Sequence, residues 1–226
     1  MSHVVSCNSM QKTHVIIFLC SCMSCNIDHI FYINLDKRAD RKEEIAHELK
    51  KMHWKAERFS AVYAAPPKGI VGCTKSHLAV IKLAKERNYK NVLILEDDFV
   101  FTESPLLIET ELNKLFRYNP RFDVCFLAYN LHHGELDMNN VFLVKTTKCS
   151  TASAYIVNGH YYDKLIELYE YAIPELDKTM KHWIYANDQI WHRLQEKDNW
   201  YCFVIKLGRQ SIGFSDNANQ VMDYHC

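Results

Sequence analysis

Four apolar residues followed by three acidic residues stand near the middle of the chain, in the stretch Val92-Leu93-Ile94-Leu95-Glu96-Asp97-Asp98. A strand that is apolar at every position is typical of a central parallel strand whose two faces are both covered by helices. In sheets of that kind, ligands bind beyond the carboxyl ends of the strands. We therefore expect the three acids at the end of this strand to lie in the functional site.

The three adjacent carboxylates predict a metal site. They repel one another, and sheltering them from water adds a desolvation cost. A divalent cation removes this conflict, and hard oxygen ligands suit Mn²⁺ or Mg²⁺. Such a cation would bridge the two phosphates of a nucleotide sugar and stabilise the leaving diphosphate. A solvated acidic turn is the alternative, and the cluster alone leaves both interpretations open.

Strand patterns and helix patterns alternate on both sides of this stretch. Strand-like runs occupy residues 30–33, 59–62, 124–127, 141–144, 154–157 and 200–207. Helix-like periodicity occupies residues 40–52, 74–87, 104–116, 161–171 and 188–195. The alternation predicts an α/β layer fold with a mainly parallel central sheet.

Local signals set the expected helix ends. Asp40 stands three residues before Glu43, as in a capping box, and Ser104-Pro105 reads as an N-cap followed by the first helical residue. Pro174 is expected to end the helix that starts near Tyr161.

The composition indicates one domain of ordinary size with a substantial core. The chain has 226 residues, of which 48% are hydrophobic, and its formal net charge is zero. A protein held to nucleic acid by bulk charge is therefore not expected. A small anionic ligand met by a few local cations remains compatible with this balance.

Residues 1–27 are interpreted as a leader, and residues 28–226 as the folded domain. The apolar run at 15–20 is too short to span a membrane, so no spanning segment is expected. The leader resembles a weak secretory signal, with a disordered segment or an added strand as alternatives, so the cytoplasm and the secretory lumen both stay open. The nine cysteines are interpreted as free thiols, with a zinc site at Cys20, Cys22 and Cys25 as a weaker alternative.

Several motifs occur in the order found in a known family. They are Phe31-Tyr32-Ile33-Asn34-Leu35-Asp36-Lys37-Arg38-Ala39-Asp40-Arg41, Gly72-Cys73-Thr74-Lys75-Ser76-His77-Leu78, Leu95-Glu96-Asp97-Asp98, Thr151-Ala152-Ser153-Ala154-Tyr155-Ile156-Val157, Asn187-Asp188-Gln189 and Ser215-Asp216. On these motifs the chain resembles glycosyltransferase family 25, which includes lipooligosaccharide and procollagen galactosyltransferases. The resemblance covers roughly residues 30–220.

The resemblance implies a single domain of the GT-A type, a Rossmann-like α/β fold. It also implies a UDP-sugar donor, most often UDP-galactose, together with Mn²⁺ and inversion at the anomeric carbon. The acceptor would be a hydroxyl group on a glycan or on a protein such as collagen-like hydroxylysine. Inversion requires one in-line displacement and a base that deprotonates the acceptor hydroxyl.

The donor is expected to contact residues after the first strand and at the start of the second helix. Asn34 would bind the base or ribose beside Leu35, and Arg38 would approach phosphate together with Arg41. Ser76 and His77 are expected in the first helical turn, where free N–H groups suit a diphosphate.

The acids receive separate roles. Asp98 is the first choice as metal ligand, Glu96 would face the ribose or a second metal position, and Asp97 would also lie at the donor. Asp188, at the start of a helix, is the candidate general base, with Glu175 and Asp177 as rivals.

Less specific candidates are His132-His133 in a polar loop, His225 near the chain end and Trp183, which could stack on a sugar. Two other functions remain as alternatives. The first is a nucleotide-sugar or glycan-binding module without catalysis, and the second is a metal-dependent phosphohydrolase that uses the same carboxylates.

Overall fold

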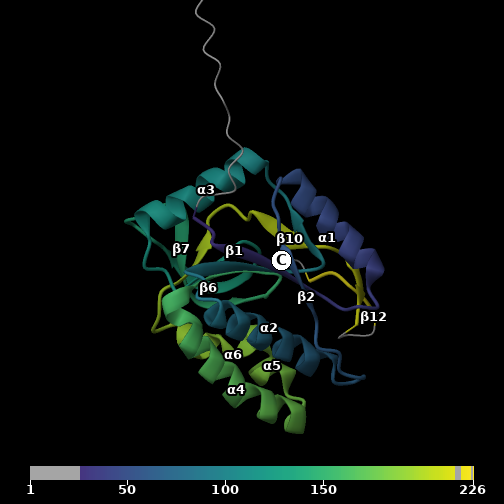
Figure 1. The fold of residues 1–226 in the computed structure, drawn as a ribbon. Helices are drawn as coiled ribbons and strands as arrows, with labels where there is room; N and C mark the ends of the chain where they lie inside the picture. Colours follow the sequence, from purple (N-terminus) through teal and green to yellow (C-terminus); the bar gives the residue numbers. More distant parts are fainter. Residues whose placement is uncertain (1–25, 217–219, 225) are drawn as a thin grey trace, which may run out of the picture.

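The computed structural model describes residues 26–216, 220–224 and 226 of the chain. An eight-stranded sheet of order β2-β1-β3-β8-β5-β9-β7-β6 forms its centre, and helices lie on both faces of this sheet (Figure 1). The strands are β1 (His29–Asn34), β2 (Glu57–Ser60), β3 (Asn91–Glu96), β5 (Val124–Phe126), β6 (Asn130–Leu136), β7 (Leu143–Ser150), β8 (Ala154–Asn158) and β9 (Trp200–Phe203).

Six of the eight strands run in one direction. β1 is parallel to β2 and β3, and β5 is parallel to β9, whereas β8 and β7 are antiparallel to both of their neighbours. The predicted α/β class with a mainly parallel sheet is therefore confirmed, although antiparallel pairs also occur within it. The order places the carboxyl ends of β1, β2 and β3 at one edge, directly beside the predicted acidic site.

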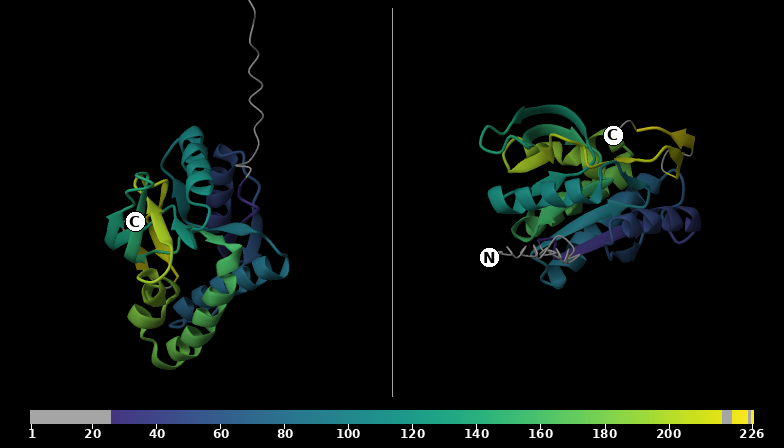
Figure 2. Two further views of the ribbon diagram at one scale, coloured as in Figure 1. Left: turned by 90° about the vertical axis from the view of Figure 1, so that its left-hand side faces the viewer. Right: turned by 90° about the horizontal axis from the view of Figure 1, so that it is seen from above.

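Four long helices and three short ones cover the sheet. They are α1 (Ala39–Lys51), α2 (Gly69–Glu86), α3 (Pro105–Tyr118), α4 (Tyr162–Thr179), α5 (His182–Tyr185), α6 (Asn187–Ile190) and α7 (His192–Gln195). Figures 1 and 2 show α1 and α3 on one side of the sheet and α2 and α4 on the other. Two small antiparallel sheets complete the fold, one of β4 (Phe99–Phe101) with β10 (Gly208–Gln210) and the other the C-terminal hairpin of β11 (Gly213–Ser215) with β12 (Gln220–Met222).

Alternate residues of β3 build two separate cores. Leu93 and Leu95 pack in the cluster that includes residues of α1 and α3, while Val92 and Ile94 pack in the cluster that includes residues of α2 and α4. All four side chains are fully buried. Successive side chains of a strand point to opposite faces, and burying each one contributes about 1.5–3 kcal/mol. The apolar run therefore holds both helical layers, as the sequence predicted.

Three helix ends differ from the predictions. α1 begins at Ala39, where Asp40 binds the Arg38 side chain instead of capping backbone N–H groups. α2 begins at Gly69, five residues before the predicted start. α4 continues through Pro174, because buried residues on both sides of the proline, among them Tyr169 and Leu176, hold the helix against its neighbours. The Ser104 cap of α3 is confirmed.

The predictions for the N-terminal segment and for Cys20, Cys22 and Cys25 lie outside the described residues, apart from Asn26 and Ile27. Ile27 is buried in the core cluster with Ile30 and Leu49. Within the described part of the chain, no helix is both long enough and apolar enough to cross a membrane.

Candidate active site

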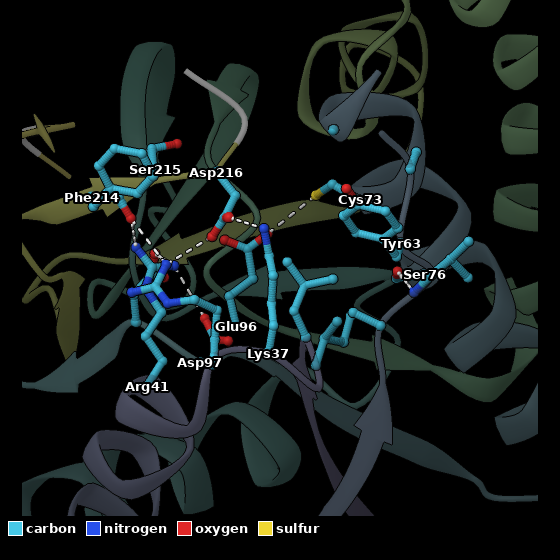
Figure 3. A pocket seen from close by; sticks show the side chains of 18 of the residues that line it. Lys37, Arg41, Tyr63, Cys73, Ser76, Glu96, Asp97, Phe214, Ser215 and Asp216 are labelled. Atoms are coloured by element: carbon cyan, nitrogen blue, oxygen red, sulfur yellow. Dashed lines mark hydrogen bonds and ion pairs between the residues drawn. The ribbon is translucent and has the colours of Figure 1, made fainter. Parts of the chain in front are cut away.

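A cavity of about 260 Å³ opens at the edge where β1, β2 and β3 end (Figure 3). Its walls come from the ends of β1 and β3, the loop after β2, the first turns of α2 and the β11 strand. It is lined by three basic and four acidic side chains, Lys37, Arg38, Arg41, Glu96, Asp97, Asp98 and Asp216. The predicted acidic cluster therefore lies in a cavity where cations from the first βα connection surround it.

Asp98 is the most constrained of these acids. Asp98 is 4% exposed, and its Oδ2 forms an ion pair with Arg41 Nη1 at 2.7 Å and accepts a hydrogen bond from Gln210 Nε2 at 3.0 Å. Its Oδ1 is buried and has no hydrogen-bond partner among the described residues. Burial, and then the charge of Glu96, raise the pKa of Asp98 to about 7. A buried carboxylate oxygen without a partner is costly, and it marks a position where a ligand would be favourable.

The residues fit the divalent cation expected from the sequence. The donor set is carboxylate oxygen, which suits Mn²⁺ or Mg²⁺, and the partnerless Oδ1 of Asp98 offers a free ligand atom. A bound cation would also favour the ionised form of Asp98, which burial opposes. Asp98 and Glu96 are the residues that would hold it.

Asp97 is held in place by scaffold residues. Asn34 Nδ2 donates to Asp97 Oδ2 at 2.8 Å and to the Arg38 carbonyl at 3.0 Å, while Arg58 Nε donates to Asn34 Oδ1 at 2.9 Å. Both amide hydrogens of Asn34 are therefore used within the protein. Asn34 is 1% exposed and does not line the cavity. This arrangement makes Asn34 a support for Asp97 and leaves Leu35, which does line the cavity, closer to any bound donor.

Arg38 and Lys37 connect the first strand to the C-terminal hairpin. Arg38 Nη1 contacts Asp216 Oδ2 at 2.8 Å, and Lys37 Nζ contacts Asp216 Oδ1 at 2.5 Å. Arg38 and Arg41 also both donate to the Phe214 carbonyl, at 3.1 and 2.8 Å. Three cations thus converge on one wall of the cavity, each satisfied by groups that an anionic ligand could replace.

The start of α2 differs from the prediction for Ser76 and His77. Both lie more than a turn inside the helix, because it begins at Gly69, so their N–H groups are not free as predicted. Ser76 Oγ instead accepts from Val62 N and donates to the Gly72 carbonyl, both at 2.8 Å. The helix N-terminus that borders the cavity is at Gly69.

Gly72 lets α2 approach the loop after β2. A Cβ atom at this position would lie 2.4 Å from the Val62 carbonyl oxygen, a backbone atom that cannot move aside easily. The same loop carries Tyr63, which lines the cavity with 60% of its surface exposed. The glycine of the Gly72-Cys73 motif is therefore needed for packing, and the packing positions an exposed aromatic ring at the cavity.

His77 contacts the acidic cluster from inside the protein. It is fully buried, with Nδ1 2.8 Å from Tyr155 Oη and Nε2 3.1 Å from Glu96 Oε1. Cys73 Sγ lies 3.6 Å from the same Glu96 oxygen. Burial raises the pKa of Glu96, but the hydrogen bond and charge of His77 outweigh it, so the net shift is downward. His77 is therefore placed to orient Glu96.

Asp188 lies within electrostatic range of Glu96 but does not line the cavity. Its Oδ2 accepts from Thr151 N and from Gln189 Nε2, both at 3.1 Å. Thr151 has a φ of 87°, an unusual conformation for a β-branched residue and one that recurs at functional sites. Burial, followed by the charge of Glu96, raises the pKa of Asp188. A carboxyl group with a raised pKa next to the acid cluster is consistent with a general base.

The rival bases and the less specific candidates lie elsewhere. Asp177 forms an ion pair with Lys68 at 2.6 Å, and His132 Nε2 lies 2.9 Å from Ser150 Oγ. Trp183, on α5, is 60% exposed, and none of these residues lines the cavity. His225 lies outside the described residues. The sequence did not identify Tyr63 or Gln210, because Tyr63 stands in a loop and Gln210 in the short strand β10, and neither belongs to a motif.

Comparison with known proteins identifies a family. The model of glycosyltransferase family 25 (LPS biosynthesis protein) matches residues 67–180, half of the chain. A comparison with curated proteins gives no match.

Three solved structures share part of the architecture. A197 from STIV is 12% identical, with 87% of this chain and 93% of that chain covered and a TM-score of 0.44. Mannose-1-phosphate geranyltransferase from Thermus thermophilus is 7% identical (82% and 75% covered, TM-score 0.46). A glycosyltransferase involved in the glycosylation of the major capsid of PBCV-1 is also 7% identical (77% and 80% covered, TM-score 0.45). At these TM-scores the likenesses carry no weight in the assignment.

The fold and the family match define the class: this is an α/β glycosyltransferase. The chain belongs to glycosyltransferase family 25, which confirms the resemblance seen in the sequence motifs.

Proposed function

We propose that this protein transfers a hexose, most often galactose in this family, from a UDP-sugar to an acceptor hydroxyl with inversion. The observation that carries the proposal is the buried, partnerless Oδ1 of Asp98 in a cavity that also contains three cations. A nucleotide diphosphate with a divalent cation is the ligand that complements both charges. The cation, held by Asp98 and Glu96, would neutralise the negative charge on the leaving diphosphate.

The cavity offers complementary surfaces for the two parts of the donor. Tyr63, Leu35 and Val62 form an apolar wall on which a base can stack. Arg38, Arg41 and the start of α2 offer charge and N–H groups to the diphosphate. This division supports a nucleoside diphosphate-sugar, and the choice of uridine follows the family resemblance.

The acceptor reaction assigns a role to Asp188. The acceptor oxygen attacks the anomeric carbon, the bond from that carbon to the diphosphate oxygen breaks, and the hydroxyl proton passes to the Asp188 carboxylate. Its raised pKa supports this role, because a stronger base accepts the proton more readily. The acceptor is a hydroxyl group on a glycan or on a protein such as collagen-like hydroxylysine.

A donor screen tests the proposal. UDP release would be measured from UDP-galactose, UDP-glucose and UDP-N-acetylglucosamine, with and without acceptors, in Mn²⁺, Mg²⁺ or chelator. We expect acceptor-dependent UDP release with one donor, lost in chelator and restored by Mn²⁺. UDP binding without turnover under every condition would favour the binding-module alternative, and release of inorganic phosphate would favour the phosphohydrolase.

A further inference from the structure

Cys73, His77 and Glu96 form a second group of metal-ligating side chains on the cavity wall. Glu96 Oε1 lies 3.1 Å from His77 Nε2 and 3.6 Å from Cys73 Sγ, and the three ligand atoms all lie within 4.8 Å of one another. Cys73 and His77 stand four residues apart on α2, so both project from one face of the helix. We propose that this cluster binds Zn²⁺, at a position distinct from the hard-oxygen position at Asp98.

The donor set matches zinc better than manganese or magnesium. Zinc binds thiolate sulfur at about 2.3 Å and imidazole nitrogen or carboxylate oxygen at about 2.0–2.2 Å, in tetrahedral geometry. Those bond lengths place neighbouring ligand atoms about 3.3–3.7 Å apart, close to the two separations measured from Glu96. A soft thiolate ligand also favours Zn²⁺ over the harder cations. Because Cys73 and Glu96 line the cavity, the fourth position would face the cavity and accept water or a ligand.

The environment of His77 supplies the support that a metal-binding histidine needs. Such a histidine donates its other ring N–H to an acceptor, which fixes the ring orientation. Tyr155 Oη lies 2.8 Å from His77 Nδ1 and both residues are fully buried, so the ring is already held with Nε2 toward Glu96. Metal binding at Nε2 would place the ring proton on Nδ1, from which it donates to Tyr155 Oη, while the Cys73 thiol releases its proton to solvent.

The local field also favours a cation. Besides Glu96, the carboxylates of Asp188 and Asp98 lie within electrostatic range of Cys73. Their negative charges would stabilise a cation bound beside Cys73. The inferred site does not depend on the proposed reaction. One consequence does rest on the proposed function. Zinc at this cluster would use Glu96 as a ligand, so it should inhibit sugar transfer supported by Mn²⁺.

Metal binding would be tested on the full chain without donor or acceptor. Cys7, Cys20, Cys22 and Cys25 would be replaced by Ser, because these N-terminal thiols would contribute a background signal. Titration with Co²⁺ should give one equivalent with a thiolate charge-transfer band, and Zn²⁺ should displace it. Cys73→Ser should abolish the band, Tyr155→Phe should weaken binding by about 10–100-fold, and Cys226→Ser, which removes a buried thiol outside the cluster, should leave it unchanged.

X-ray absorption of the zinc-loaded protein gives a measurement that needs no substitution at the cluster. We expect one sulfur neighbour at about 2.3 Å together with one imidazole. The absence of stoichiometric zinc, a zinc shell of oxygen and nitrogen only, or an unchanged Co²⁺ spectrum in folded Cys73→Ser would each overturn the proposal. Because these measurements require no turnover, a protein that binds zinc but transfers no sugar would refute only the proposed function.

Discussion

The two halves of the central sheet present polar groups to the site in different ways. In the parallel half, β2-β1-β3, the acids at the strand ends are tied to neighbouring groups, as in the contacts of Arg41 with Asp97 and Asp98. In the other half, the edge strand β6 is exposed at six of its seven residues. Asp188, near this half, contacts a backbone N–H group and an amide instead of a cation.

The difference suggests separate functions for the two halves of the sheet, donor binding in the parallel half and acceptor binding in the other. Fixed charges in a sheltered cavity are organised before a ligand arrives, which suits a diphosphate and a metal ion. An exposed hairpin near the proposed base Asp188 would accommodate acceptors of different shapes without changing the proposed donor site. If this division is correct, substitutions on the two sides should affect different measurable quantities.

Loss of the base should have the largest effect on turnover. Asp188→Asn keeps the size of the side chain but cannot accept the acceptor proton, so kcat should fall by about 10²–10⁴-fold. Donor binding, measured by calorimetry with UDP and Mn²⁺, should stay close to that of the parent, since Asp188 does not line the cavity. Glu175→Gln serves as a control and should retain activity. Full activity in Asp188→Asn would assign the base elsewhere.

Loss of the metal ligand should affect both donor binding and turnover. We expect Asp98→Asn to lower transfer by at least about 10²–10³-fold, because one electrostatic contact to the leaving group is removed. In contrast to Asp188→Asn, it should also abolish the Mn²⁺ dependence of UDP binding. If Asp98→Asn still binds UDP in an Mn²⁺-dependent way, Asp98 is not the metal ligand. The proposed separation of donor and acceptor functions between the two halves of the sheet would then lose its support.

The same substitution has an expected effect on stability. The pKa of Asp98 is raised to about 7, above its unfolded value of 3.8, so the folded state binds the proton more tightly. The stability that this proton contributes is therefore present at pH below 3.8 and is lost as the pH rises through 7. Without metal, the melting temperature of the parent should fall as the pH rises from about 4 to about 7, and that of Asp98→Asn, which cannot ionise, should fall less. If the melting temperatures of the two proteins changed equally with pH, the raised pKa of Asp98 would be contradicted.

Removal of the exposed ring at the donor wall should have a smaller effect. A stacked aromatic contact contributes about 0.5–1.5 kcal/mol, so Tyr63→Ala should raise the KM for the donor by about 2–10-fold and leave kcat and the acceptor KM unchanged. Tyr118→Ala, which removes a similarly exposed ring from α3, is the control and should change neither constant. If Tyr63→Ala changed the acceptor KM alone, Tyr63 would belong to the acceptor site and not to the donor site.

Much of the architecture follows from local patterns. The apolar run before Glu96 identified the central strand, because full apolarity over a short segment is stable only when both faces are covered. The Ser104-Pro105 cap acts within one turn of its own helix and was also predicted correctly. By contrast, the end of α4 was predicted wrongly at Pro174, since the burial of Tyr169 and Leu176 on either side of the proline outweighs its local penalty.

The sequence by itself determined the residue types and the place of the acidic cluster: three carboxylates at the end of a buried strand, with basic residues after the first strand. Only the tertiary structure decided how they are used. Asn34 supports Asp97 instead of facing the cavity, His77 points at Glu96 from the interior, and Tyr63 enters the site from a loop without a motif. These roles depend on contacts between segments distant along the chain. Such contacts arise from packing, which no local spacing encodes.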